Sequence, residues 1–310
     1  YYDSDEPSIN HRTLFFDIEV EKGLRYSTPK DASNRITSIA YYISGQYTVL
    51  ILDQSGTVKN GYQVVTINGE DYNVKIEAFP NEILLLTRFV KIWSDISPTI
   101  VTAWNGDVFD IPYLYNRISN VITRQFANKL SPIGIVNTRE VGKRDIVCEI
   151  AGVSFIDYMQ LYKNFTYNEE PSYALEYIAQ KELKRGKFKY EGSLDDLYNR
   201  SLTDFINYNV TDVELMVALD KKVDLIEIAR GICHAGHVPY NDYIFSSKFL
   251  DGAILTWCKR NNKIAFTTPK NNNATQAEGA FVKPPKPGLY KYCYDLDLES
   301  EYPNNIKTLN

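Results

Sequence analysis

The sequence predicts an α/β layer fold, and three observations support this prediction. Short β-rich runs alternate with amphipathic helical segments along most of the 310 residues. Hydrophobic residues make up 44% of the chain, which is enough for a sizeable core and excludes a wholly disordered protein. No run approaches the ~20 apolar residues of a membrane helix, because the most apolar window, residues 83–93, contains Arg88 and Lys91.

The first hundred residues are predicted to contain mainly strands. Residues 13–20 alternate like a strand, residues 35–43 and 47–53 have the composition of two more strands, and shorter strand-like pieces lie between residues 54 and 80. A turn at Ser44-Gly45 predicts an antiparallel meander. The helical periodicity of residues 81–96 then predicts the first helix, with Asn81 as its N-cap.

The middle of the chain is predicted to alternate between strands and helices. The expected elements are a short buried strand over 99–104, a helix over 111–122, a hairpin over 134–150, a strand over 154–161, and helices over 172–183 and 201–230. Pro112 suits the first turn of a helix, so Asp110 is predicted to be an N-cap.

The character of the sequence changes after Gly231. A turn-rich stretch, HAGHVPYND, precedes a predicted helix over residues 244–259. Residues 267–288 are rich in Asn, Gly and Pro and indicate a connector, and residues 290–302 have the pattern of a strand. We therefore predict four segments: residues 1–11, 12–224, 225–267 and 268–310.

Asp17 and Glu19 form the first of three acidic motifs. Side chains alternate along a strand, so these two carboxylates share one face while Leu14, Phe16 and Ile18 share the other. A bound Mg²⁺ or Mn²⁺ would relieve the repulsion between the two acids. The alternative is a half-exposed strand with two solvated acids.

The other two motifs are expected in or beside helices. Asp110 would lie near the C-terminal end of the preceding strand, where it could bind an ion. Asn105 could hydrogen-bond a ligand or simply cap a turn. Tyr208 and Asp212 are four residues apart and would present a phenol and a carboxylate on one helix face. An ordinary N-cap and an ordinary surface pair are the alternatives.

The order of these motifs is more specific than any one of them. A strand with DxE, an N…FD that opens a helix and a helical YxxxD resemble the three exonuclease motifs of the DEDDy nucleases. The segments SYALEYIAQKEL, GKFKYEG and FINYNVTDVE resemble the proofreading domain of family B DNA polymerases, particularly those of T-even-type bacteriophages. The segments EGAFVKPPKPGLYKY and DLESEYPNNI are similar to the same family's entry into the palm and its motif A.

This resemblance implies a domain organisation and a reaction. Residues 1–11 would be a linker or the remnant of an N-terminal domain, and residues 12–224 a ribonuclease-H-like exonuclease domain with a mixed sheet and flanking helices. Residues 225–267 would be a small helical segment of the N-terminal domain, and residues 268–310 the start of a palm. The implied reaction is hydrolysis of the 3′-terminal phosphodiester of DNA by two Mg²⁺ or Mn²⁺ ions, which releases a nucleoside monophosphate.

The resemblance also implies roles for individual residues. The carboxylates would bind the two ions, with Asp17 bridging them; they are Asp17, Glu19, Asp110 and Asp212. Tyr208 would position the attacking water, and Lys187 would offset the charge of the scissile phosphate.

Further implied contacts involve the DNA. Asn105 would hydrogen-bond the substrate, and Phe109 and Tyr113 would wedge against the terminal base, with core packing as the alternative for at least one of them. The hairpin over 134–150, with Arg144 among its basic residues, would help to separate primer from template.

In the last segment, Asp297 would be the aspartate of motif A and Tyr302 the residue that senses the sugar 2′ position. Glu301 departs from the family's leucine there. The sequence contains neither a K-x-x-x-N-S-x-Y-G helix nor a D-T-D-S motif, so we do not expect this segment alone to synthesise DNA. The remaining palm, fingers and thumb, a sliding clamp, and a single-stranded or frayed primer 3′ end are the implied partners.

Compartment and alternatives follow from simpler features. There is no basic and apolar leader pattern, and four widely separated cysteines indicate free thiols, so we expect a cytoplasmic protein, in the host cell if it is phage-encoded. The net charge of −5 argues against a broad basic surface for nucleic acid, and Cys233, His234 and His237 lack the further ligands that zinc needs.

The strand pattern ends close to Asn310, so we expect a piece of a longer protein. Half of a split polymerase and an RNA-trimming nuclease remain alternatives, although the palm-like tail speaks against the latter.

Overall fold

The computed structural model describes residues 11–23, 25–141, 145–166, 169–265, 279 and 281–309, with residues 141 and 145 described by their backbone alone. The chain divides into two compact units, residues 1–265 and 266–310. In the second unit the described helix is α10, Glu301–Leu309.

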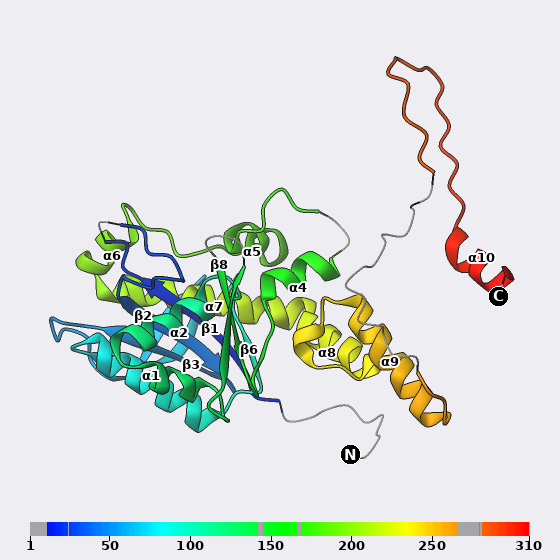
Figure 1. Ribbon diagram of the computed structural model, residues 1–310. Helices are drawn as coiled ribbons and strands as arrows, with labels where there is room; N and C mark the ends of the chain where they lie inside the picture. Colours follow the sequence, from blue (N-terminus) through cyan, green and yellow to red (C-terminus); the bar gives the residue numbers. More distant parts are fainter. Residues whose placement is uncertain are drawn as a thin grey trace. The chain divides into compact units, whose positions relative to one another are not determined.

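A mixed sheet of seven strands forms the centre of the first unit, in the order β4-β5-β3-β2-β1-β6-β9 (Figure 1). Its strands are β1 Thr13–Val20, β2 Ile36–Ile43, β3 Gln46–Leu52, β4 Gly61–Ile67, β5 Glu70–Phe79, β6 Ile100–Thr102 and β9 Ser154–Phe155. Strands β1, β2 and β3 form the predicted antiparallel meander, whereas β6 runs parallel to β1. The predicted α/β class with a mixed sheet is therefore confirmed.

Helices cover both faces of this sheet (Figure 1). One face packs against α1, Glu82–Ile96, and α2, Asp110–Val121, through a core that includes Leu14, Phe16 and Ile18 of β1. The opposite face packs against the long helix α7, Leu202–Val223, through a core that includes Phe15. Since side chains alternate along a strand, Asp17 and Glu19 share the face of Phe15 and point toward α7.

Helices α5, Leu175–Leu183, and α6, Leu194–Arg200, pack against α7. Helix α8, Leu225–Gly236, packs against α4, Tyr158–Phe165, and α9, Ser246–Arg260. The remaining helical pieces are α3 Arg124–Ala127 and the 3₁₀ turns Asn128–Leu130 and Tyr240–Asp242. A separate antiparallel pair, β7 Val136–Val141 and β8 Asp145–Ile150, is the predicted hairpin. None of these described helices is long and apolar enough to cross a bilayer.

Four sequence predictions of local structure are wrong. The predicted strand over 154–161 ends after Phe155, because Asp157 accepts a hydrogen bond from the Gln160 N–H and caps helix α4. The predicted helix over 201–230 is two helices, which separate at Asp224 in the left-handed conformation with φ 55°. The predicted strand over 290–302 has no described strand beside it to accept its backbone hydrogen bonds, and its last residues begin α10. Asp110 is the first residue of α2 rather than its N-cap, which is Phe109.

The region 54–80 is more regular than the sequence indicated. It forms the hairpin of β4 and β5, which turns at Asn68-Gly69 with φ angles of 51° and 86°. An Asn-Gly pair adopts such angles at little cost and is a strong hairpin signal.

Candidate active site

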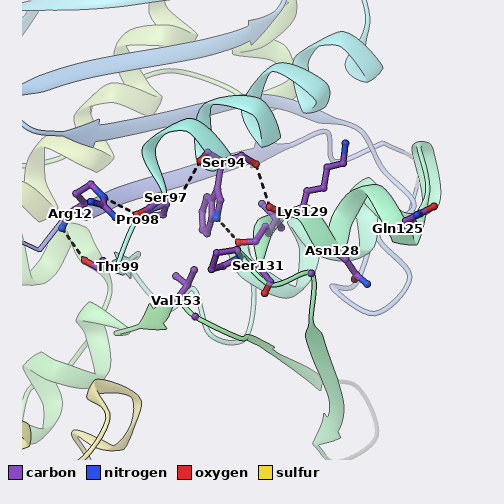
Figure 2. A pocket seen from close by; sticks show the side chains of 15 residues that line it. Arg12, Ser94, Ser97, Pro98, Thr99, Gln125, Asn128, Lys129, Ser131 and Val153 are labelled. Atoms are coloured by element: carbon purple, nitrogen blue, oxygen red, sulfur yellow. Dashed lines mark hydrogen bonds between the residues drawn. The ribbon is translucent and has the colours of Figure 1, made fainter. Parts of the chain in front are cut away.

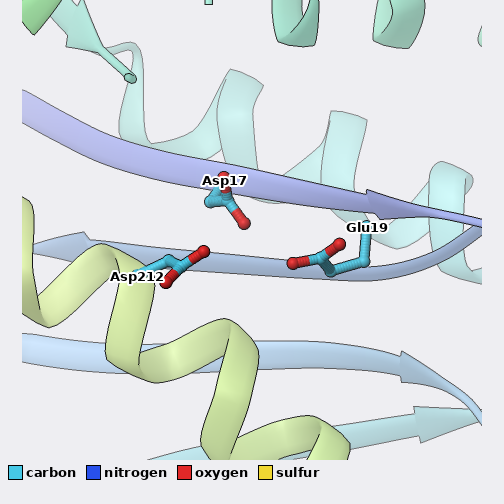
Figure 3. A group of neighbouring side chains, drawn as sticks. All are labelled: Asp17, Glu19 and Asp212. Carbon is cyan, nitrogen blue, oxygen red and sulfur yellow. The ribbon is translucent and has the colours of Figure 1, made fainter. Parts of the chain in front are cut away.

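Strand β1 and helix α7 bring three carboxylates together (Figure 3). Asp17, Glu19 and Asp212 each offer an oxygen, and these oxygens all lie within 4.8 Å of one another. Asp17 and Glu19 come from one face of β1, and Asp212 points toward them from α7 (Figure 3). In the part of the chain that the structure describes, no other group of three His, Cys, Asp or Glu side chains converges in this way, and Cys233, His234 and His237 do not.

The electrostatics of this cluster favour a cation. Burial is the largest cause that raises the pKa of Asp17 well above its usual range, and repulsion from Glu19, Asp110 and Asp212 raises it further. Burial and repulsion from Asp212 raise the pKa of Glu19 to about 8. The Oδ1 atom of Asp212 is buried and has no hydrogen-bond partner among the described residues. An all-oxygen donor set with an unpartnered carboxylate oxygen fits a hard divalent cation such as Mg²⁺ or Mn²⁺.

Lys187 lies against the same cluster. Its Nζ is 2.6 Å from Asp212 Oδ2 and 5.5 Å from the centroid of the Tyr208 ring. Burial alone would lower the pKa of Lys187, but attraction from Asp212 and Asp17 raises it. The backbone N–H of Lys187 donates to the Glu176 carboxylate, which anchors the loop that carries Lys187 after helix α5. The lysine therefore supplies one positive charge among the acids.

Asp110 is close to the cluster but not part of it. Its Oδ1 accepts a hydrogen bond of 3.2 Å from the backbone N–H of Ile18, the residue between Asp17 and Glu19. Strand β6 pairs with β1 only as far as Phe15, so the carboxylate takes the place of a neighbouring strand beyond that point. This bond explains why Asp110 does not cap its own helix. Burial raises the pKa of Asp110 to about 7.

Tyr208 lies one helical turn before Asp212 and is partly buried. Burial and the nearby charges of Glu19 and Asp212 raise the pKa of its phenol, so the hydroxyl stays protonated and can donate a hydrogen bond. Its ring packs edge-on against Tyr190, with centroids 5.3 Å apart.

A cavity of about 410 Å³ opens beside the acids. Its charged residues include Asp17, Lys187 and Asp212, and its remaining wall contains apolar, aromatic and polar side chains: Trp104, Asn105, Met159, Tyr173, Leu175 and Glu176, together with Ala174. Asn105 is in the left-handed conformation with φ 64°, and the Trp104 indole N–H donates to the Tyr173 carbonyl at 3.0 Å.

Gly106 permits the tight turn that leads into Asp110. A Cβ atom at this position would lie 2.6 Å from the Ala103 Cβ and 2.8 Å from the Phe155 ring, distances at which something must shift. A side chain larger than hydrogen would therefore displace the turn that carries Asn105 and Asp110.

The structure separates the two predicted wedge residues. Phe109 is partly exposed, whereas Tyr113 is wholly buried and its hydroxyl donates to the Asn34 carbonyl at 2.8 Å. The prediction that Tyr113 contacts DNA is therefore wrong, and the core-packing alternative holds for it. Arg144 lies outside the described residues.

Two residues at the site were missed by the sequence analysis. Asn209, next to Tyr208, donates from Nδ2 to Asp17 Oδ2 at 2.8 Å, and its Oδ1 accepts from the Ser38 hydroxyl at 2.7 Å. The only signal was the position of Asn209 within the YxxxD motif. Ser38 lies in an apolar strand and gave no signal.

A second hollow lies elsewhere on the first unit (Figure 2). It measures about 830 Å³ and lies between the start of β1 and the end of α1, where Arg12, Ser97 and Lys129 are among its lining. It contains no carboxylate side chain, so it cannot bind metal in the way that the cluster on β1 and α7 can.

Asp297 and Tyr302 both lie in the second unit, where they are exposed. Tyr302 is in α10 and Asp297 is in irregular backbone before it. Asp297 therefore does not lie on the predicted strand over residues 290–302, which is not formed.

Comparisons with known proteins agree with this geometry. Residues 2–178 match the family model described as DNA polymerase family B, exonuclease domain. The chain is 30% identical to the DNA-directed DNA polymerase of Escherichia phage RB69 over 96% of its own length and 35% of the relative's. It is 33% identical to that of Enterobacteria phage T4 over 75% of its length and 26% of the relative's, and 25% identical to DNA polymerase 1 of Pyrococcus abyssi over 94% and 38%.

The chain thus spans about a third of the length of the curated relatives that it matches. The motif with Tyr208 and Asp212 lies beyond the part that the family model covers, but within the span shared with the RB69 relative, which takes in nearly the whole chain. The predicted resemblance is confirmed: this chain belongs to the family B DNA polymerases and carries their exonuclease domain.

Proposed function

We propose that this chain removes nucleotides from the 3′ end of DNA by metal-dependent hydrolysis, as the proofreading part of a longer polymerase. The observation that carries the proposal is the convergence of Asp17, Glu19 and Asp212 within 4.8 Å beside an open cavity. The family assignment supplies the reaction class, hydrolysis of a phosphodiester.

The acids would hold two Mg²⁺ or Mn²⁺ ions. Asp17, Glu19 and Asp212 are the direct ligands in this proposal. Asp110 either binds the same ions or holds strand β1 in place through its hydrogen bond from the Ile18 N–H. When bound, such ions lower the pKa of a water and stabilise the leaving 3′ oxygen. Tyr208 would donate a hydrogen bond from its phenol to orient that water, and Lys187 would exchange its bond to Asp212 for one to the scissile phosphate.

The DNA end would enter the cavity beside the acids. Asn105 and the rings of Trp104 and Tyr173 lie in its wall and offer a hydrogen-bonding group and flat apolar surfaces to the terminal nucleotide. Phe109 is partly exposed and remains our candidate for a wedge against the base. Arg144 remains a proposed contact at the hairpin that would separate primer from template.

An assay with a 5′-labelled single-stranded DNA tests the proposal. The chain should shorten the DNA stepwise with Mg²⁺ or Mn²⁺ and release nucleoside monophosphates. The double variant Asp110→Ala/Asp212→Ala should fall to the level of the protein-free reaction, and Asp251→Ala, an exposed acid on α9, should keep full activity. Full activity in the double variant would refute the assigned roles. An RNA strand of the same sequence, if cut faster, would favour an RNA-trimming nuclease instead.

We further propose that polymerisation, and any contact with a sliding clamp, belong to the whole polymerase with its palm, fingers and thumb, acting in the host cytoplasm if the protein is phage-encoded. Asp297 and Tyr302 would serve motif A there. The alternative of a split polymerase has its own support in the second unit, where apolar side chains such as Phe281, Leu289 and Leu296 are at least 88% exposed. Mixing the chain with a separately expressed palm, fingers and thumb tests it, because primer extension should appear only in the mixture.

A further inference from the structure

A chain of two hydrogen bonds, one partly buried and one buried, leads away from Asp17. Asn209 of α7 donates from Nδ2 to Asp17 Oδ2 at 2.8 Å, and the hydroxyl of Ser38 donates to Asn209 Oδ1 at 2.7 Å. Ser38 and Asn209 are both 0% exposed. Ser38 lies on β2 directly opposite Glu19 in the register of β1 and β2. The three side chains thus connect two strands of the sheet to the helix that carries Asp212.

This arrangement gives the amide of Asn209 a fixed direction. An ionised carboxylate accepts hydrogen bonds only, so Asp17 requires the NH₂ end of the amide. If the amide were reversed, its oxygen would face a carboxylate oxygen at contact distance and repel it. The Ser38 hydroxyl can donate or accept, so Asp17 alone sets this direction, and Ser38 holds the amide in place by bonding its oxygen end. Ser38 therefore anchors the amide in the orientation that ionised Asp17 selects, and the ionised carboxylate is the form that binds metal.

We propose that Asn209 and Ser38 are positioning residues that fix the rotation of the Asp17 carboxylate for the divalent ions, with Ser38 acting only through Asn209. The inference rests on the proposed metal-binding role of Asp17. Groups that orient a metal ligand commonly contribute about 10–100-fold in metal affinity. A purely structural role, in which the two residues only satisfy buried polar atoms, would instead lower the stability of the fold without a specific effect on metal affinity.

A double-mutant cycle on Mn²⁺ affinity separates these roles, with free Mn²⁺ followed by electron paramagnetic resonance. We expect Asn209→Ala to weaken binding about 10-fold or more and Ser38→Ala to weaken it by a smaller factor. The double variant should bind no more weakly than Asn209→Ala, because Ser38 has no route to the metal once Asn209 is gone. Thr211→Ala is the matched control, since this buried hydroxyl on the same helix donates to the Asn207 carbonyl, and the variant should bind Mn²⁺ like the wild type.

Thermal melts of every variant accompany the titration. If Asn209→Ala does not fold, the Mn²⁺ affinity of Ser38→Ala alone decides between the two roles. This variant should fold, because the loss of one hydroxyl leaves almost no cavity. Unchanged Mn²⁺ affinity in folded Ser38→Ala and Asn209→Ala would overturn the inference, and so would independent, additive losses. Failure of the proposed function has a different signature: the wild type would bind no Mn²⁺, or Asp212→Ala would bind it equally well.

Discussion

At the scale of single residues, Lys187 is the only positive charge placed directly against the acidic cluster among the described side chains. Removing it leaves Asp212 beside Asp17 and Glu19 without its ion-pair partner. The sequence did predict this residue, but only through the family resemblance, because a basic run such as KRGKFK has no signal of its own for a buried partner.

We predict that Lys187→Ala lowers the free energy of unfolding by about 1–3 kcal/mol near neutral pH without metal, because a buried carboxylate loses its charged partner. Urea unfolding measures this change, and added Mg²⁺ should reduce it. Lys189→Ala, an exposed lysine in the same loop, is the control and should unfold like the wild type. An equal loss in both variants would contradict the assigned contact.

The raised pKa values predict how stability depends on pH. An acid whose folded pKa is raised binds its proton more tightly when folded, so its contribution is fully present below the unfolded pKa and is lost as pH rises through the folded pKa. For Glu19 this window runs from about 4.5 to about 8. The melting temperature without metal should therefore fall across this window, and Mg²⁺ should stabilise the protein more near its upper end than near its lower end. In Glu19→Gln both trends should be weaker; a wild-type melting temperature that rises across the window would contradict the assignment.

At the scale of elements, the sequence predicted the parts of the site that depend on one element. Strand alternation correctly placed Asp17 and Glu19 on one face, and helical spacing placed Tyr208 and Asp212 on α7. It could not predict Asn209 and Ser38, because their roles depend on how α7 lies across β1 and β2. It also misplaced Asp110 at a cap, since nothing local shows that a carboxylate will replace a strand partner for Ile18.

The turn at Gly106 gives an element-scale prediction. Gly106→Ala should destabilise the protein by about 1–3 kcal/mol, because its Cβ would overlap Ala103 and Phe155, and it should also slow DNA cleavage by moving Asp110. Gly231→Ala is the matched control: its Cβ would meet nothing within 4 Å in helix α8, so we expect an unchanged or slightly raised melting temperature. Thermal melts and the DNA assay check both variants, and a neutral Gly106→Ala would show that the turn tolerates a methyl group.

At the scale of the whole molecule, the residues of the candidate active site lie within the first unit. Asp17, Asp110, Lys187 and Asp212 all come from residues 1–265. We predict that the chain truncated after Ala265 keeps its cooperative melting transition and its Mn²⁺ affinity, as measured by the same melts and titrations. Loss of metal binding on truncation would show that the second unit contributes to the site. The sequence predicted a boundary near residue 268, and it assigned a strand to residues 290–302 because an alternating pattern does not reveal whether a partner strand exists.

The ion pair between Lys187 and Asp212 has one further consequence for how the molecule matures. Because the ammonium group of Lys187 already balances part of the negative charge, the polypeptide can fold before a metal ion binds. A chelator such as EDTA should therefore switch the protein off reversibly while its circular dichroism spectrum remains unchanged, and replenished Mg²⁺ should restore turnover without a refolding delay.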